Sequence, residues 1–298
     1  MRRKLPIALL AAAMAGFVVL VAAAGADTVG PITFEMSQGY TPGDINNQPT
    51  TNNLPNGKWQ KTGPYDAQVA LVSTYRDAAG YGFVGQALRI SDAMTSGNFG
   101  DQTFSPGLGD EAGEKTAVNA NLSGGLRQPN FTASFMIGTT QATQQCSACL
   151  TPLSLSVSPD RGDGARMSYL RFEDHPDGVH VYFIDVKDPG PVGHVADFRE
   201  SDIATLDRAH SHVVTFEIKF KDGAHNDEVH IYIDGQKKKD GTTWEDYYRY
   251  DPEQAGSGNQ VPTVDKLLFR EGGTMNPTDA GGGFLIDRVL LTSSGRTR

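Results

Sequence analysis

Short runs rich in Val, Ile, Phe, Tyr and Thr recur along the chain, and Gly, Asp, Asn and Pro separate them. Runs bounded by turn residues are typical of β-strands. No stretch after residue 26 shows the period of a long helix, so the sequence predicts an all-β protein. The expected strands are 32–36, 68–73, 82–91, 131–138, 153–160, 166–174, 178–187, 210–220, 227–235, 265–271 and 284–293. Residues 200–206 (ESDIATL) are expected to form one helical turn.

Apolar and polar residues alternate within these runs. In GVHVYFIDVK (178–187), Val179, Val181 and Phe183 point to one face, while His180 and Tyr182 point to the other. About eleven such strands joined by antiparallel turns predict a single antiparallel β-sandwich, with the apolar faces turned inward. The outward faces carry side chains suited to ligand binding, and the candidate residues are Arg171, Glu173, His180, Tyr182, His230 and Tyr232. A solvated sheet face is the alternative interpretation.

The N-terminus has the pattern of a secretory signal peptide. MRRK is a positive region, an Ala- and Leu-rich apolar stretch follows, and Ala24-Gly25-Ala26 matches a cleavage site. We therefore expect residues 1–26 to be removed and residues 27–298 to form one secreted domain. An uncleaved membrane anchor is the alternative.

Charge limits the choice of partner. Removal of the three basic residues at the N-terminus changes the formal charge from −9 to −12. An acidic chain argues against nucleic acid as a partner, and no other apolar run reaches the length that spans a bilayer. Cys146 and Cys149 are the only two cysteines. Because an exported chain meets an oxidising compartment, a local disulfide is the first expectation and free thiols the second.

Two segments resemble a known fold family. HSHVVTFEIKFKDGAHNDEVHIYIDG (210–235) and the terminal GFLIDRVLLTS (283–293) resemble the laminin-G-like and concanavalin A-like jelly rolls. The resemblance extends over 31–293 and implies a jelly roll in which the last strand pairs near the first. The chain also resembles a group of exported bacterial proteins in FGDQTFSP, DGARMSYLRFED and TWEDYYRYDPEQAG. This fold hosts lectins, glucanases and lyases, so the resemblance implies no single activity.

Catalytic motifs are scarce. The E-x-D-x-x-E arrangement of a glucanase, which places three acids on one strand face, is absent from the sequence. Arg171, Glu173, His180 and Tyr182 are residue types that a polysaccharide lyase uses, with His and Tyr as base and acid. In such an enzyme His230 and Tyr232 are expected to lie beside them. Their spacing does not match that of the lyases.

Calcium is the metal that an exported jelly roll would most readily bind, through oxygen ligands in loops. The candidate ligands lie in two long loops and are Asp44, Asp101, Asp110 and Glu111, with Glu114 close in sequence. Asp227 is more simply part of a hairpin turn, and solvated acidic loops are the alternative.

The segment GTTWEDYYRY (241–250) is expected to form a corner that packs Trp244 on the sandwich and lines the rim of a ligand groove. We therefore expect an exported, non-catalytic protein that binds carbohydrate or another surface polymer. A polysaccharide-cleaving enzyme, lyase or glycoside hydrolase, is the first alternative. A structural envelope or matrix protein is the second.

Overall fold

The structure, a computed structural model, describes residues 26–49, 57–75, 81–96, 101–117, 125–187 and 190–295. The predicted signal peptide lies outside the described residues, apart from Ala26.

The larger of two sheets, sheet A, has nine strands. Its strands follow the order β14-β13-β12-β7-β16-β5-β4-β2, and β1 also pairs with β16. The bounds are β1 Asp27–Ile32, β2 Gly43–Asp44, β4 Ala67–Leu71, β5 Gln86–Ile90, β7 Asn130–Thr139, β12 His212–Lys219, β13 Glu228–Ile233, β14 Gln236–Gly241 and β16 Phe284–Ser294.

Sheet B has seven strands in the order β11-β10-β9-β8-β15-β6-β3. The bounds are β3 Gln60–Lys61, β6 Thr103–Phe104, β8 Ser154–Asp160, β9 Tyr169–His175, β10 Gly178–Lys187, β11 Asp197–Leu206 and β15 Lys266–Gly272. Every strand pair in both sheets is antiparallel. The predicted all-β, antiparallel jelly-roll sandwich is thus confirmed.

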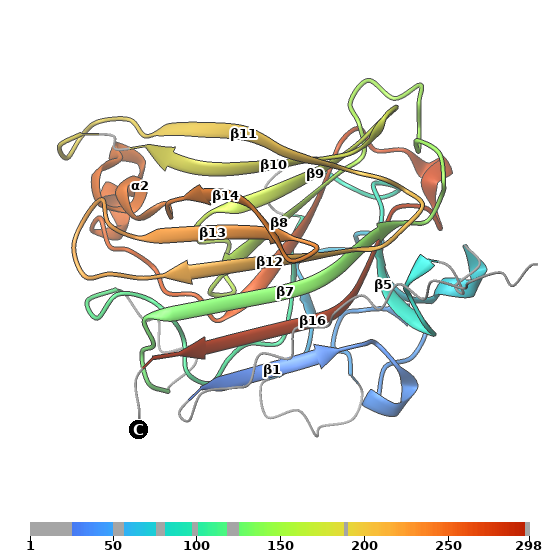
Figure 1. Cartoon of the computed structure of the whole chain (residues 1–298), viewed down its shortest axis with the longest axis horizontal. Coiled ribbons are helices and arrows are strands. Elements are labelled where there is room, and N and C mark those ends of the chain that lie inside the picture. Colours follow the sequence, from blue (N-terminus) through green and yellow to red (C-terminus); the bar gives the residue numbers. More distant parts are fainter. Residues whose placement is uncertain are drawn as a thin grey trace, which may run out of the picture.

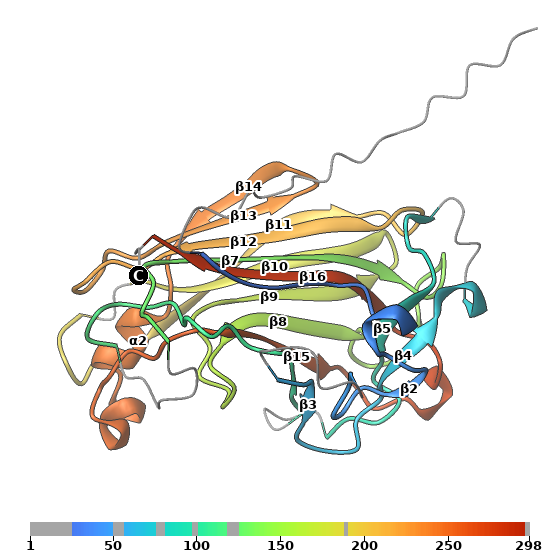
Figure 2. The same cartoon turned by 90° about the horizontal axis from the view of Figure 1, so that it is seen from below.

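Helical segments are short. Among the described residues they are the helix α2 (Glu245–Tyr250) and the 3₁₀ turns η1 (Met36–Gln38), η2 (Val72–Thr74), η3 (Pro252–Ser257) and η4 (Pro277–Asp279). The helix α2 and strand β5 lie at opposite ends of the molecule in both views (Figure 1, Figure 2). Strands β1 and β16 lie side by side along one edge of Figure 1, as the resemblance implied for the first and last strands.

The apolar residues of the alternating strands form the core of the sandwich. Val179, Val181 and Phe183 are buried, and they belong to one apolar cluster that both sheets share. Phe135 of β7 packs edge-on against two rings of sheet B, with centroid distances of 6.2 Å to Phe172 and 6.1 Å to Phe269. Burial of these faces is the dominant favourable term in folding.

Several strands differ from the sequence prediction. The strand expected at 32–36 is wrong beyond Ile32, because β1 spans Asp27–Ile32 and the 3₁₀ turn η1 begins at Met36. The two-residue strands β2, β3 and β6 were not expected. The helical turn expected at 200–206 is wrong, because this segment is the second half of β11 and pairs with β10. The lysine-rich QKKKDG run forms β14 at the edge of sheet A. Lysines on an edge strand discourage pairing with other chains, so this strand owes its composition to its position.

Cys146 and Cys149 form the expected local disulfide, with their Cα atoms 5.3 Å apart. None of the helices in the described residues is long and apolar enough to cross a membrane.

The contact between the sheets gives a first prediction. Replacement of Phe135 by Ala removes a fully buried ring that touches both sheets, and it should lower the free energy of unfolding by about 3–5 kcal/mol. Urea denaturation measures this change. A loss below about 1 kcal/mol would show that the ring does not hold the sheets together.

A buried acid gives a second prediction. Glu271 follows Leu267 and Phe269 on the inward face of β15, and burial raises its pKa from 4.5 to about 8. The folded state therefore keeps a proton that the unfolded state releases, and stability falls between pH 4.5 and 8. Glutamine does not titrate, so Glu271→Gln should make the free energy of unfolding less dependent on pH between 4.5 and 8, by up to about 1.4 kcal/mol for each pH unit. Parallel stability curves for variant and wild type would contradict this.

Candidate functional site

A pocket of about 750 Å³ opens at the α2 end of sheet B. We call it the aromatic pocket. Its lining residues are Arg161, Asp163, Gly164, Ala165, Arg166, Tyr169, Ile184, Phe198, Trp244, Tyr247, Tyr248, Glu253, Gln254, Ser257, Gln260 and Pro262. They come from three strands of sheet B, the turn after β8, α2, η3 and the segment that follows η3. A volume of this size is within the range of small-ligand sites.

Five rings in mutual contact form the wall of the pocket. The Trp244 ring lies 5.6 Å from Tyr169 and 4.8 Å from Phe198. The Tyr247 ring lies 5.9 Å from Trp244, 5.2 Å from Phe198 and 5.1 Å from Tyr248. Phe198 is 44% exposed although it is a large apolar side chain. An exposed ring within an aromatic cluster offers a flat apolar surface to a ligand.

The sandwich fixes the position of Trp244. Its backbone N–H donates to the carbonyl of Met167 at 2.8 Å, and its indole N–H donates to the carbonyl of Ile184 at 3.2 Å. The hydroxyl of Tyr248 donates to the carbonyl of Arg166 at 2.9 Å. Trp244 and α2 are therefore anchored to sheet B, and the expected corner packing of this segment takes the form of a short helix.

Polar groups of the pocket are paired with one another. Arg161 and Asp163 form an ion pair at 2.7 Å. The Tyr247 hydroxyl donates to Glu253 at 3.0 Å and accepts from Gln254 at 2.7 Å. Burial and the Glu253 carboxylate raise the pKa of Tyr247 to about 12, so this hydroxyl keeps its proton at neutral pH.

Next to the pocket lies a second group of the predicted residues. Arg171 shares the outer face of β9 with Tyr169 of the pocket, two residues away. Arg171 pairs with Glu173 at 2.6 Å and with Glu200 at 2.8 Å, and its guanidinium lies 4.8 Å from the centre of the Tyr182 ring. We call this outer surface of β9, β10 and β11 the polar sheet face.

His180 is held on both sides by carboxylates. Its Nδ1 lies 2.9 Å from Asp202, and its Nε2 lies 3.0 Å from Asp177. Partial burial lowers the pKa of His180, but the bonds to Asp202 and Asp177 outweigh this and raise the pKa above 6.5. Desolvation and the nearby Glu173 raise the pKa of Tyr182. Both shifts favour the protonated form of the group.

The structure places the predicted residues in two separate regions. Arg171, Glu173, His180 and Tyr182 lie together on sheet B, and Trp244 lies in the adjoining pocket. His230 and Tyr232 are on β13 of sheet A and alternate with buried Val229, Ile231 and Ile233. They point away from the shared core, so the expectation that they sit beside His180 and Tyr182 is wrong.

The four proposed calcium ligands are occupied by protein donors. Asp44 pairs with Lys61 at 2.7 Å, and Glu111 pairs with Arg127 at 2.7 Å. Asp110 accepts a bond from the backbone N–H of Leu126 at 2.9 Å.

Asp101 accepts hydrogen bonds from Thr95 and Ser96, and these bonds hold its pKa below the usual range despite desolvation. Each of the four carboxylates thus stabilises its own loop. The structure does not gather Asp44, Asp101, Asp110 and Glu111 into one site.

Sequence reasoning missed Tyr169, Phe198 and Tyr247 as pocket residues. The two-residue period of β9 could have placed Tyr169 on the face of Arg171. Phe198 gave no signal because its segment was not expected to be a strand. Tyr247 reaches the pocket because α2 brings it within contact distance of Trp244.

No protein-family model matches the chain, and no curated protein matches it. Among solved structures it is similar to alginate lyase Aly36B, with 12% identity, a TM-score of 0.42, and coverage of 93% of this chain and 100% of that chain. It is also similar to the endo-β-1,4-glucuronan lyase of the fungus Trichoderma reesei (14%, 0.37, 86% and 95%). A third similar structure is the carbohydrate-binding module CBM66 from Bacillus subtilis (10%, 0.38, 81% and 98%). Because these TM-scores are low, the similarity supports no conclusion about function.

The contacts of His180 give a third prediction. Asp202→Asn removes one of its two carboxylates and should lower the pKa of His180, as measured by NMR titration of the imidazole. Because the folded-state pKa is raised, these contacts stabilise the fold fully below pH 6.5, and that stabilisation is lost as the pH rises through the folded pKa. A His180 pKa below 6.5 in the wild type would contradict this account.

Proposed function

We propose that residues 27–298 are exported as one domain and bind a neutral polysaccharide, without cleaving it, in the aromatic pocket and along the polar sheet face. The observation that carries the proposal is the cluster of aromatic rings, with exposed Phe198 beside Trp244, in a pocket of about 750 Å³. Sugar rings have apolar faces that pack on aromatic side chains, while amides and hydroxyls such as Gln254 and Ser257 bond to their hydroxyls.

Charge in the pocket favours a neutral ligand. Its lining includes two cations, Arg161 and Arg166, and two acids, Asp163 and Glu253, so their formal charges cancel. An anionic polymer would need an excess of cationic groups.

Protonation favours binding over cleavage. A general base has to give up its proton near the working pH. The Tyr247 hydroxyl, with its pKa raised to about 12, keeps its proton at neutral pH. Both ring nitrogens of His180 are bonded to carboxylates, and Arg171 and Glu173 are engaged with each other. The N-terminal signal sequence and the Cys146–Cys149 disulfide support export.

The fourth prediction tests this function. Phe198→Ala removes an exposed ring, so it should leave the fold intact and weaken binding to a neutral polysaccharide by roughly tenfold, or 1.4 kcal/mol. Affinity electrophoresis against neutral glucans, mannans and xylans measures the effect, with uronate polymers for comparison. Tyr232→Ala, on the outer face of the other sheet, is the matched control and should bind like the wild type.

Three results would each reject part of the proposal. Absence of retention by every neutral polymer would reject glycan binding. Release of new reducing ends or unsaturated products by the wild type would show that the protein is an enzyme, and stronger retention by uronate polymers would show that charge governs recognition.

A further inference from the structure

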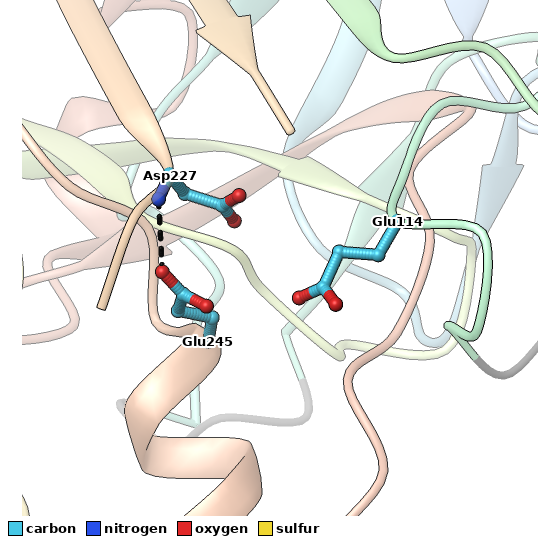
Figure 3. Close-up of side chains that lie close together, drawn as sticks. All are labelled: Glu114, Asp227 and Glu245. Atoms are coloured by element: carbon cyan, nitrogen blue, oxygen red, sulfur yellow. Dashed lines mark hydrogen bonds between the residues drawn. The ribbon is translucent and has the colours of Figure 1, made fainter. Parts of the chain in front are cut away.

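Three buried carboxylates from distant parts of the chain meet beside α2 (Figure 3). Glu114 lies on a loop before β7, Asp227 directly precedes β13, and Glu245 is the first residue of α2. One oxygen from each lies within 4.8 Å of the others. Each residue is at most 4% exposed. We call this group the acidic cluster.

Neighbouring protein groups offset only part of the negative charge of the acidic cluster. Arg249 binds Glu114 through its Nη2. Glu245 Oε1 accepts the backbone N–H groups of Asn226 at 2.7 Å and Asp227 at 2.9 Å. With all three acids ionised and one guanidinium present, two negative charges remain uncompensated among these four side chains. Burial of uncompensated charge raises the free energy of the folded state, so these carboxylates should either take up protons or bind a further cation.

One carboxylate oxygen points to a cation rather than a proton. Glu245 Oε2 is buried and accepts no hydrogen bond, and its ion pair with Nε of Arg249 is long, at 3.6 Å. Asn226, whose backbone N–H binds Glu245, also has a buried Oδ1 that accepts no hydrogen bond. Buried oxygens normally have a partner, and a glutamate that leaves an oxygen without a hydrogen bond beside two more carboxylates offers a ligand to a hard cation.

The electrostatics agree with that geometry. Burial, together with the charges of Glu245 and Glu114, raises the pKa of Asp227 to about 8. Burial also raises the pKa of Glu245. A bound cation would replace the repulsion among these carboxylates by attraction.

We propose that Glu114, Asp227 and Glu245 bind one calcium ion. Calcium fits because all three ligands are carboxylates, whereas zinc prefers nitrogen and sulfur and magnesium requires strict octahedral geometry. The nearby imidazole of His225 bonds to Asp246 at 2.6 Å, so its Nδ1 already has a carboxylate partner.

The position of the ion gives it a structural consequence. Glu245 begins α2, and Trp244 of the aromatic pocket directly precedes it. An ion that joins Glu245 to Asp227 and Glu114 ties α2 to β13 and to the loop that carries Glu114. It thereby fixes the segment that presents Trp244 and Tyr247, and this second step rests on the proposed glycan function.

The fifth prediction is stoichiometric calcium binding. Purified protein, stripped with chelator and dialysed against calcium, should hold one ion per chain by elemental analysis. Saturating calcium should raise Tm by about 5 °C. Terbium in place of calcium should show emission sensitised by the aromatic residues of this segment, Trp244 and the tyrosines of α2.

Asp227→Asn and Glu245→Gln keep the shape of the side chains and remove charge, so each should abolish the calcium-dependent rise in Tm. The matched control is Glu271→Gln, which changes a buried acid outside the acidic cluster and should keep the rise. If Glu245→Gln does not fold, Asp227→Asn decides, because its amide oxygen can accept from the Lys221 backbone N–H while its amide NH2 donates to the Thr243 hydroxyl.

Absence of a bound ion and of a Tm shift in the wild type would overturn the proposal, and the cluster would then be a protonated ion-pair group. A full shift in Asp227→Asn, or an equal shift with magnesium, would overturn the assignment to calcium at this site. Metal content and Tm are measured without glycan, so failure of glycan binding leaves the calcium result standing.

Discussion

The contact between the inner faces of the two sheets is the constraint on which the rest of the structure depends. Phe135 belongs to sheet A, and its partners Phe172 and Phe269 belong to sheet B. Because side chains alternate along a strand, every apolar residue that faces this contact leaves its neighbours on the outer surface. Leu170 and Phe172 are buried, and so Tyr169, Arg171 and Glu173 must face outward. The polar sheet face is thus a consequence of the core.

The aromatic pocket requires a second constraint, because a sheet face alone has no depth. The short helix α2 and the turn η3 supply a wall beside β9, β10 and β11. Hydrogen bonds from Trp244 to the carbonyls of Met167 and Ile184 bind this wall to sheet B. The pocket therefore exists only where the helix meets the sheet.

Much of the fold was predictable from local pattern, and the exceptions share a cause. The direction of His180 and Tyr182 follows from the two-residue period, and the structure confirms it. The segment that forms β11 lacks a regular alternation, and its pairing with β10 decides its conformation. The separation of His230 from His180 likewise depends on which sheet each strand joins. That choice is made by long-range packing, which a local pattern does not encode.

The acidic cluster shows the same limit in a sharper form. Glu114 precedes Asp227 and Glu245 by more than a hundred residues of chain, and those two are 18 residues apart. Each of the three has an ordinary local interpretation as a loop, turn or corner residue. Only the closure of the sandwich brings them together (Figure 3). Repulsion among buried carboxylates opposes that closure, and the single guanidinium of Arg249 leaves it only partly offset. A cation bound by the three carboxylates would link the segments that carry them and would hold the start of α2, next to Trp244, in place. The shape of the proposed binding surface would then depend on charges that lie outside the pocket.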